Sequence, residues 1–401
     1  MKRKRMIGVG IVAAFCAGLA LRPASRAQTS AVPAQQPAAS VRFAFGGNAA
    51  QVPAEFIGNL IFLPVHVNQG QPSLFELDST AAISSVDPQR ATELGIANVQ
   101  ASVLNLSGVD ISLPDFAQIA NNDFGARVGR TYEGTIGNDV FAGVILELDY
   151  ARQTVRIYDP AGYQYSGHGK TFPLTFHDGM PVIRAKFAVG GHRSVEGAFV
   201  LNTTLDASLV ISDKFAQQHH LFSSHMKTIP VASGELGVGG NAVIGRLESF
   251  QIGGYEIQAP LAAFAQGRLP GDGDAQFAGE IGGGMLRRFT VIFDYVRQIV
   301  ILDSNSEFRS DDHEDMSGIS VAAGGPNLKT FEVTQVRPGT PGSSAGVEKG
   351  DVIAGVDEEA AADLSLDALR GLFRQVGHKY KLLIERNGKT LTINVQMRRL
   401  L

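Results

Sequence analysis

The sequence has a single cysteine and no tryptophan, and it lacks basic clusters beyond its first five positions. The cysteine, Cys16, lies in an N-terminal segment that we expect to be removed, so the mature chain would contain no disulfide. Lys and Arg are otherwise scattered, and the formal net charge is -4. Because nucleic-acid-binding proteins carry a concentrated basic surface, we expect no nucleic-acid partner.

Long apolar runs are also missing. The longest, residues 6–21, follows basic residues 2–5 and falls short of the roughly 18 residues that a membrane span needs. Ser25 and Ala27 offer the small side chains that a signal peptidase reads. We therefore expect residues 1–27 to be an export signal, a periplasmic or secreted mature protein, and no stable membrane span in it. A membrane anchor is the alternative.

Glycine is abundant, with 46 residues, whereas charged residues make up only 18% of the chain. This composition favours a strand-rich globular protein with glycine turns, and a length of 401 residues favours two or three compact units. Residues 28–40 are rich in Ala, Gln and Pro without apolar periodicity, so we expect a flexible tether there.

An internal repeat is the most informative feature. Residues 75–80 read Phe-Glu-Leu-Asp-Ser-Thr and residues 199–204 read Phe-Val-Leu-Asn-Thr-Thr, so each copy runs from an apolar strand into a small polar turn. Each copy closes on a nearly identical segment, residues 149–153 and 294–298, which predicts a hairpin turning at Tyr-x-Arg. The second copy is longer by about 21 residues, which we place around residues 219–236.

The repeat predicts a mainly β fold with two similar β-barrel-like lobes, residues 41–165 and residues 166–306. The acidic run 311–315 predicts a linker, residues 307–316, that has no core of its own. Residues 317–401 form a separate α+β unit with one helix over residues 366–375, capped by Ser365. Its short strands are expected at residues 318–321, 331–336, 351–354, 381–385 and 391–395.

The two lobes resemble the pepsin-like and retropepsin-like aspartic peptidases. In that family each lobe carries an apolar strand, an Asp-Thr-Gly turn and a later apolar-apolar-Gly segment packed behind it. Residues 78–80 and 202–204 occupy the two turns, and residues 135–137 and 280–282 occupy the packing segments. The resemblance implies a cleft between the lobes with Asp78 and the degenerate dyad residue Asn202 at its floor.

Residues 337–353 closely follow a second family pattern, the Pro-Gly, Ala-Gly and Gly-Asp-Val-Ile segments of bacterial PDZ domains. The resemblance implies that residues 317–401 bind polypeptide segments or protein C-termini, with the peptide added as a strand and its carboxylate held by backbone amides. The binding loop would comprise Ser317, Gly318, Ile319 and Ser320. The side-chain pocket would comprise Leu369, Leu372 and Phe373, whose helical spacing equally suits a core.

The catalytic chemistry of an aspartic peptidase requires two carboxylates that share one proton and act as acid and base on a bound water. Asn202 has the shape of aspartate but has no transferable proton. Asp78 would then titrate alone. The turns also have Thr80 and Thr204 where the family has glycine, which puts the close approach of the backbone amide in question.

Ser79 and Thr203 keep the hydroxyls that, in the family, hydrogen-bond across to the opposite lobe. The pattern therefore favours an exported aspartyl-protease-like protein that is catalytically weak or inactive and binds peptides. An active aspartic endopeptidase using Asp78, alone or with Asp206 as the second carboxylate, is the alternative. A structural scaffold with closed grooves is a third possibility.

No cofactor or metal is expected. His219, His220 and His225 lie close together without a nearby cysteine or carboxylate to complete a metal site, so a solvated loop or helix face explains them better. Residues 282–284 are three glycines without the Lys-Ser or Lys-Thr of a phosphate-binding loop, which indicates a turn. The remaining acids with no recognisable spacing, interpreted as surface residues, are Asp110, Asp115 and Asp123.

Overall fold

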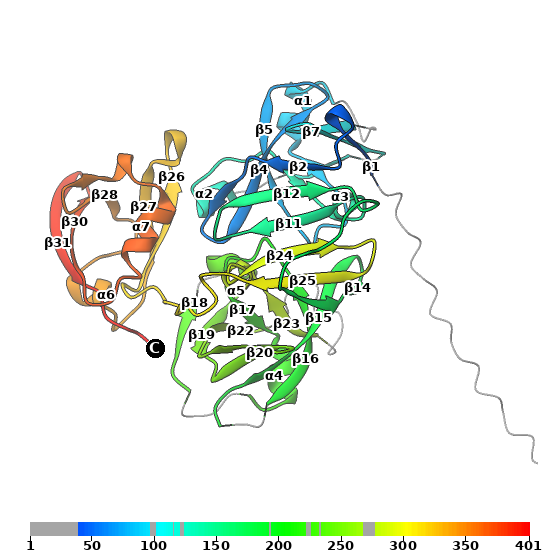
Figure 1. Cartoon of the computed structure of the whole chain (residues 1–401). Coiled ribbons are helices and arrows are strands. Elements are labelled where there is room, and N and C mark those ends of the chain that lie inside the picture. The colour runs from blue at the N-terminus through cyan, green and yellow to red at the C-terminus, as the bar shows by residue number, and fades with distance from the viewer. Residues whose placement is uncertain are drawn as a thin grey trace, which may run out of the picture. The chain divides into compact units, whose positions relative to one another are not determined.

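The described residues of the computed structural model form four β-sheets, one in each half of a two-lobed body, one shared between the halves and one near the C-terminus (Figure 1). The structure describes residues 39–96, 102–114, 116–120, 124–191, 194–221, 226–231, 234–267 and 277–401. All of these belong to one unit, Pro37–Leu401. The expected export signal and nearly all of the expected tether lie outside the described residues.

The first lobe is built on a nine-stranded sheet with the order β1-β8-β7-β4-β5-β10-β6-β9, and β3 pairs with β4. Its strands are β1 (Ser40–Phe43), β3 (Glu55–Ile57), β4 (Leu60–Val67), β5 (Pro72–Leu77), β6 (Ser85–Val86), β7 (Ser102–Leu106), β8 (Val109–Leu113), β9 (Ala117–Gln118) and β10 (Gly134–Ile136). Its helices are η1 (Ala44–Gly46), α1 (Pro88–Glu93), α2 (Phe124–Val128) and α3 (Asn138–Phe141).

The second lobe has a ten-stranded sheet with the order β18-β19-β22-β17-β23-β16-β15-β20-β21, and β14 pairs with β15. Its strands are β14 (Thr175–His177), β15 (Met180–Ala188), β16 (Val195–Leu201), β17 (Leu209–Ile211), β18 (Thr228–Val231), β19 (Ala242–Arg246), β20 (Ser249–Ile252), β21 (Tyr255–Gln258), β22 (Leu261–Ala265) and β23 (Phe277–Ile281). Its helices are α4 (Asp213–Gln218), η2 (Glu235–Gly237) and α5 (Gly283–Leu286).

The two sheets have the same internal order, which confirms the predicted repeat. The run β7-β4-β5-β10-β6-β9 in the first lobe matches β20-β15-β16-β23-β17-β22 in the second. In both runs the strand before the polar turn pairs in parallel with the strand of the packing segment. The extra strands of the second lobe, β18 and β19, lie between α4 and β20, close to the predicted insertion.

A six-stranded sheet joins the lobes, with the order β13-β25-β24-β11-β12-β2. Its strands are β2 (Ala49–Val52), β11 (Ile145–Asp149), β12 (Thr154–Tyr158), β13 (Lys170–Pro173), β24 (Phe289–Asp294) and β25 (Ile299–Ser304). The two predicted hairpins, β11–β12 and β24–β25, are present and pair with each other through β11 and β24 (Figure 1).

The turns of these hairpins are alike in detail. Asp149 accepts hydrogen bonds from the backbone N–H and the guanidinium of Arg152, and Asp294 does the same for Arg297. The residue after each arginine has a positive φ of 52° or 54°. Because each aspartate satisfies the turn amide directly, the recurring Asp-Tyr-x-Arg-Gln pattern specifies this turn.

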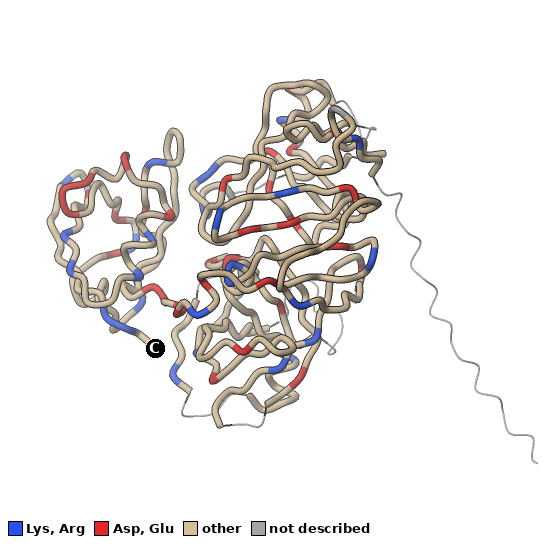
Figure 2. The backbone as a smooth tube through the Cα atoms, in the orientation of Figure 1, with Lys and Arg blue, Asp and Glu red and all other residues tan. Residues whose placement is uncertain are grey.

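The core extends through both lobes as one cluster of buried apolar residues that includes side chains from the shared sheet. Phe141 of the first lobe packs edge-to-face on Phe293 of the second, with ring centroids 5.6 Å apart. Lys, Arg, Asp and Glu are scattered along the tube in Figure 2 with both signs interspersed. None of the helices in the described ranges is long and apolar enough to cross a membrane.

Residues 317–401 form a six-stranded sheet with the order β26-β27-β28-β30-β31, and β29 pairs with β28. Its strands are β26 (Ile319–Gly324), β27 (Thr330–Val336), β28 (Val352–Val356), β29 (Glu359–Ala360), β30 (Lys379–Arg386) and β31 (Lys389–Gln396). Its helices are η3 (Pro326–Leu328), α6 (Pro341–Ala345), η4 (Ala361–Asp363) and α7 (Leu366–Leu372). The Ser365 side chain caps α7 as predicted, although α7 ends three residues earlier than expected. The mainly β fold, with two similar lobes before a small α+β unit, is thus confirmed.

Two acids of the acidic run 311–315, Asp312 and Glu314, are buried. Asp312 accepts hydrogen bonds from Arg288 at 2.7 Å and from the Ser208 hydroxyl at 3.0 Å. Glu314 pairs with Arg246 and accepts the backbone N–H of Leu400. The run has no apolar core of its own, but arginines of the second lobe compensate its charge and let it lie inside the protein.

We predict that Gly282→Ala destabilises the protein. A Cβ at Gly282 would lie 2.2 Å from the carbonyl oxygen of Ala207 and 2.5 Å from that of Leu205, so backbone would have to move. Overpacking of this kind costs about 1–3 kcal/mol, measurable as a loss of unfolding free energy in urea. Gly371→Ala in α7 is the matched control, because nothing lies within 4 Å of the added methyl, and it should be neutral or slightly stabilising. Equal stability of both variants would contradict the packing described here.

Candidate functional site

The first polar turn begins at the end of β5 and holds Asp78 with three donors. Its Oδ1 accepts hydrogen bonds from the Thr80 backbone N–H and hydroxyl, both at 2.7 Å, and from the Ala81 N–H at 3.1 Å. The Thr80 side chain therefore does not prevent donation by its amide, as the sequence suggested it could. It adds a hydroxyl donor that a glycine would lack.

The second turn repeats this arrangement around an amide. Asn202 Oδ1 accepts from the Thr204 N–H at 2.9 Å and from its hydroxyl at 2.8 Å. With the oxygen committed to these donors, Nδ2 points to Glu280 and donates to its Oε2 at 2.7 Å. Both ends of the Asn202 amide are thus engaged, and the local turn geometry matches that of Asp78.

Reciprocal hydrogen bonds hold the two turns against each other. The Ser79 N–H donates to the Thr203 hydroxyl at 3.0 Å, and the Thr203 N–H donates to the Ser79 hydroxyl at 3.1 Å. Each hydroxyl then donates to a carbonyl of the opposite strand, Ser79 to Leu201 at 2.7 Å and Thr203 to Leu77 at 2.6 Å. Both side chains are completely buried. The structure therefore places the predicted positions 78 and 202 on either side of one junction between the lobes.

The predicted packing segments lie directly behind the turns. The Asp78 N–H donates to the Ile136 carbonyl, and the Asn202 N–H donates to the Ile281 carbonyl, both at 2.9 Å. These bonds continue the parallel pairing of β5 with β10 and of β16 with β23. The same backbone support therefore fixes both turns, and the difference between the lobes lies in the side chains.

Two acids that the sequence analysis assigned no role lie beside the turns. Glu76 on β5 is two residues before Asp78 and only 5% exposed, and its Oε1 has no hydrogen-bond partner among the described residues. Burial is the main cause that raises the pKa of Glu76, and the charge of Asp78 raises it further. A hydrogen bond from Tyr132 lowers the pKa in part, and the resulting pKa is about 8. Glu76 is therefore mostly protonated at neutral pH.

Glu280 is the second of these acids and comes from a different strand. On β23 it stands opposite Val200, whereas in the first lobe Glu76 on β5 stands opposite Thr135 of β10. Each lobe thus has one glutamate in the strand pair beside its turn, but the two glutamates are on strands that are not equivalent in the repeat. A lone glutamate inside an otherwise apolar strand, as in Phe-Glu-Leu and Gly-Glu-Ile, is the sequence signal that could have revealed both.

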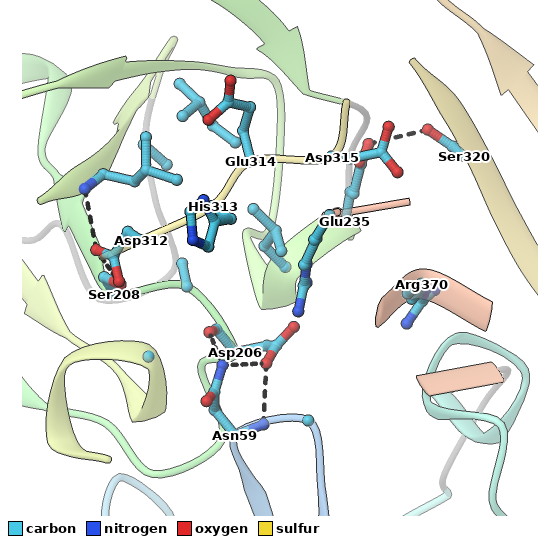
Figure 3. Close-up of a pocket in the computed structure, with 18 of the residues that line it drawn as sticks. Asn59, Asp206, Ser208, Glu235, Asp312, His313, Glu314, Asp315, Ser320 and Arg370 are labelled. Carbon is cyan, nitrogen blue, oxygen red and sulfur yellow. Dashed lines mark hydrogen bonds between the residues drawn. The ribbon is translucent and has the colours of Figure 1, made fainter. Parts of the chain in front are cut away.

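Asp206, the alternative second carboxylate, is held by another residue. Its Oδ1 accepts from the backbone N–H of Asn59 at 3.1 Å and from Asn59 Nδ2 at 2.7 Å (Figure 3). Its backbone carbonyl also accepts from Nδ2 at 2.9 Å. This carboxylate is committed to a loop of the first lobe, so it does not form a pair at position 202.

The predicted peptide-binding loop of the C-terminal unit is closed by its own side chains. Asp315 Oδ1 accepts from the Ser317 N–H at 3.0 Å, from the Ser317 hydroxyl at 2.8 Å and from the Gly318 N–H at 2.7 Å. The Ser317 hydroxyl in turn accepts from the Ile319 N–H at 2.9 Å. Three successive amides of the loop therefore already have acceptors.

The predicted pocket residues of α7 lie mainly in the core. Leu369 and Phe373 are completely buried and Leu372 packs against the same cluster. The residues of α7 and its C-terminal end that line the space beside β26 are instead Arg370, Gly371 and Arg374. Arg370 Nη2 donates to the Val321 carbonyl of β26 at 2.9 Å, so it bridges the helix and the strand.

A cavity of about 680 Å³ lies along this groove (Figure 3). Its lining includes β26 and α7 together with the acidic run 311–315 and segments of the second lobe. Ser320, the last residue of the predicted loop, donates its hydroxyl to Glu235 at 3.1 Å, and Arg337 forms an ion pair with the same carboxylate. Polar and charged side chains of both signs therefore surround the groove.

The described ranges contain no group of three His, Cys, Asp or Glu residues arranged to hold a metal ion. The His219 ring packs on Phe215 with centroids 4.2 Å apart, while His220 has a positive φ of 52° beyond the end of α4. Asp110 pairs with Arg42 at the surface. His225, Asp115 and Asp123 lie outside the described residues.

Comparison with known proteins identifies one part of the chain. The PDZ domain family model matches residues 311–397, so this part is a PDZ domain. No curated protein matches the chain. Among solved structures, the photosystem II D1 C-terminal processing protease is 27% identical, with 20% of this chain and 22% of that chain covered and a TM-score of 0.19. The present chain thus spans about a fifth of that protein.

Two further solved structures are similar over a larger share of this chain. An aspartic proteinase from Irpex lacteus is 11% identical over 65% of this chain and 99% of that chain, with a TM-score of 0.38. Basic 7S globulin from soybean is 12% identical over 65% of this chain and 95% of that chain, with the same TM-score. Scores this low support no functional argument, so the chemistry must be argued from the residues themselves.

We predict that Glu76 makes stability fall as the pH rises. Its folded pKa of about 8 exceeds the ordinary value of 4.5, so the folded protein holds a proton that the unfolded chain releases between these limits. This contribution to stability is complete below the unfolded pKa and declines up to the folded pKa, by up to about 1.4 kcal/mol per pH unit.

The measurement is the unfolding free energy of the wild type and Glu76→Gln across this pH range. The variant lacks the titrating group, so the wild type should lose stability relative to it from mildly acidic to mildly alkaline pH. Glu256→Gln on β21 is the control, because Glu256 is exposed. Parallel curves for the wild type and Glu76→Gln would show that Glu76 titrates normally.

Proposed function

We propose that this protein is an exported, protease-like peptide-binding protein that holds extended polypeptide segments without efficient cleavage. The observation that carries the proposal is the state of Asn202. Its amide has the position and turn geometry of a dyad residue, with Oδ1 bound to Thr204 and Nδ2 bound to Glu280. A side chain held in this way cannot exchange a proton with Asp78.

The chemistry of peptide hydrolysis explains why this matters. One carboxylate must take a proton from the attacking water while its partner supplies a proton, and the roles then reverse as the tetrahedral intermediate collapses. Asp78 can fulfil one role. Three donors hold its Oδ1, but position 202 supplies no carboxyl partner, so the second role has no group at that position.

The PDZ domain supports the binding half of the proposal. PDZ domains add a peptide as an extra strand at an exposed sheet edge, and here β26 is an edge strand of its sheet with α7 beside it. A segment bound at this groove would recruit a larger polypeptide to the same molecule. Export rests on the N-terminal sequence alone, and we propose a periplasmic or secreted location on that basis.

A second candidate is a slow aspartic endopeptidase, and the position of Glu280 favours it. Its carboxylate lies 2.7 Å from Asn202 Nδ2, so a second acid is present next to the dyad position, although not in it. In this candidate Asp78 remains essential and the PDZ domain delivers the substrate. The two candidates differ in a single measurable property, which is turnover that depends on Asp78.

The test is to incubate the full chain with a diverse peptide library from acidic to neutral pH and to measure both binding and cleavage by mass spectrometry. We expect binding but no cleavage above that of Asp78→Ala. Cleavage by the wild type that disappears in Asp78→Ala, with binding retained, would establish the endopeptidase and overturn the proposal.

A gain-of-function variant sharpens this test. Asn202→Asp alone would place a new carboxylate against Glu280, and the repulsion would disturb both groups. Asn202→Asp combined with Glu280→Gln restores a donor for the new carboxylate. We expect the double variant to gain at least about a hundredfold in cleavage rate, the usual scale of general acid–base catalysis, and Glu280→Gln alone to gain nothing.

A further inference from the structure

We infer that the PDZ groove accepts internal extended segments in preference to free C-termini, because the chain's own Asp315 fills the loop that would hold a terminal carboxylate. This inference rests on the proposed function and names the class of polypeptide that the groove selects. It concerns Asp315, Ser317, Gly318 and Ile319, all of which lie within residues 311–397 matched by the PDZ family model.

The first reason for this preference is that the backbone N–H groups of the loop already have acceptors. A terminal carboxylate is captured when successive backbone N–H groups of a loop point at its oxygens. Here the Ser317 and Gly318 amides donate to Asp315 Oδ1, and the Ile319 amide donates to the Ser317 hydroxyl. An incoming carboxylate would have to replace bonds that the loop already makes, whereas an internal segment does not require them.

The second step is charge. A ligand carboxylate in this loop would meet the carboxylate of Asp315 and, beside Ser320, that of Glu235. Arg337 faces the same place, but its Nη2 pairs with Glu235 and its Nε donates to the Pro230 carbonyl. Like charges close together oppose binding, so the loop disfavours a peptide with a terminal carboxylate. It does not disfavour the neutral backbone of an internal segment.

The third step is the rigidity of the loop. Gly318 has a φ of +73°, and a Cβ at this position would lie 2.2 Å from the Thr340 hydroxyl oxygen. Ser317 is completely buried, and its carbonyl accepts the Gly342 N–H at 2.8 Å. The loop is therefore fixed on α6, and it cannot readily turn its amides toward a different acceptor.

Residues 319–322 of β26 line the cavity, so this part of the strand's edge is open to a ligand, whereas α2 of the first lobe also contacts β26. The Val321 carbonyl, which accepts from Arg370, is the kind of acceptor that a ligand N–H would take over. Arg370 is half-buried and its Nη1 also donates to the Arg127 carbonyl at 2.7 Å, so a ligand N–H would displace only one of its two hydrogen bonds. An internal segment supplies the required N–H and C=O groups without bringing a terminal charge.

The test uses the full chain and two libraries of labelled decapeptides with identical sequences, one with a free C-terminal carboxylate and one with a C-terminal amide. Fluorescence anisotropy gives the Kd of each pair. Gly371→Arg, which places a long side chain into open space on α7, serves to identify the groove. Only peptides whose binding this variant removes are compared.

For the wild type we expect the two members of each pair to bind within about twofold of each other, or the amide to bind more tightly. Asp315→Ala frees the loop amides and should raise affinity for the free carboxylates about tenfold while leaving the amides unchanged. Asp315→Asn, which keeps an acceptor but removes the charge, should fall between the two. Asp363→Asn removes an exposed charge elsewhere in the domain and should change neither series.

A wild-type preference of tenfold or more for the free carboxylates would overturn the inference, whatever the variants do. Absence of groove-dependent binding in both libraries would overturn the binding role of the PDZ domain in the proposed function, and the inference with it. Because the decisive comparison is made on the wild type, poor folding of Asp315→Ala would not rescue the inference.

Discussion

The reciprocal hydrogen bonds between Ser79 and Thr203 are the constraint on which the rest of the site depends. Two hydroxyls and two amides from opposite lobes satisfy one another in a fully buried position, and each hydroxyl also reaches a carbonyl of the facing strand. An unpaired polar group in such a place costs about 1–3 kcal/mol. The junction therefore fixes where Asp78 and Asn202 lie. The two lobes are also joined by the pairing of β11 with β24 in the shared sheet.

Around this junction the two lobes have the same turn geometry but differ in their charged side chains. Asp78 and Asn202 sit in equivalent turns with equivalent threonine donors. Their acidic neighbours, Glu76 and Glu280, come from non-equivalent strands. The repeat thus preserves the threonine donors and the hydrogen bonds of the junction, and it alters the groups that would move protons. This separation of structure from chemistry is the reason for proposing binding over hydrolysis.

Much of the fold could be predicted from the sequence because it depends on local patterns. The alternating strands, the Asp-Tyr-x-Arg-Gln hairpins and the Ser365 cap all act over a few residues, and the repeat doubled each signal. The PDZ pattern at residues 337–353 located the C-terminal domain in the same way. The equivalence of the two copies also predicted that the two lobes would be alike, whereas the order of their strands came from the structure.

What could not be predicted depends on residues far apart in the chain. Glu280 meets Asn202 only because β23 lies beside β16, and the acids of the linker are buried only because Arg288 and Arg246 lie nearby. Leu369 and Phe373 have a spacing that suits a pocket or a core equally, and only packing decides between the two. Asp315 gave no signal, because an acid before a turn is common.

The two turns meet at one junction, and a double-mutant cycle on Ser79→Ala and Thr203→Ala tests this most directly. Unfolding free energies of the wild type, both single variants and the double variant give the coupling between the two side chains. We expect a coupling of at least about 1 kcal/mol, because the two hydroxyls share their hydrogen bonds. Strictly additive effects would mean that the two side chains do not interact, which would contradict the junction between the turns.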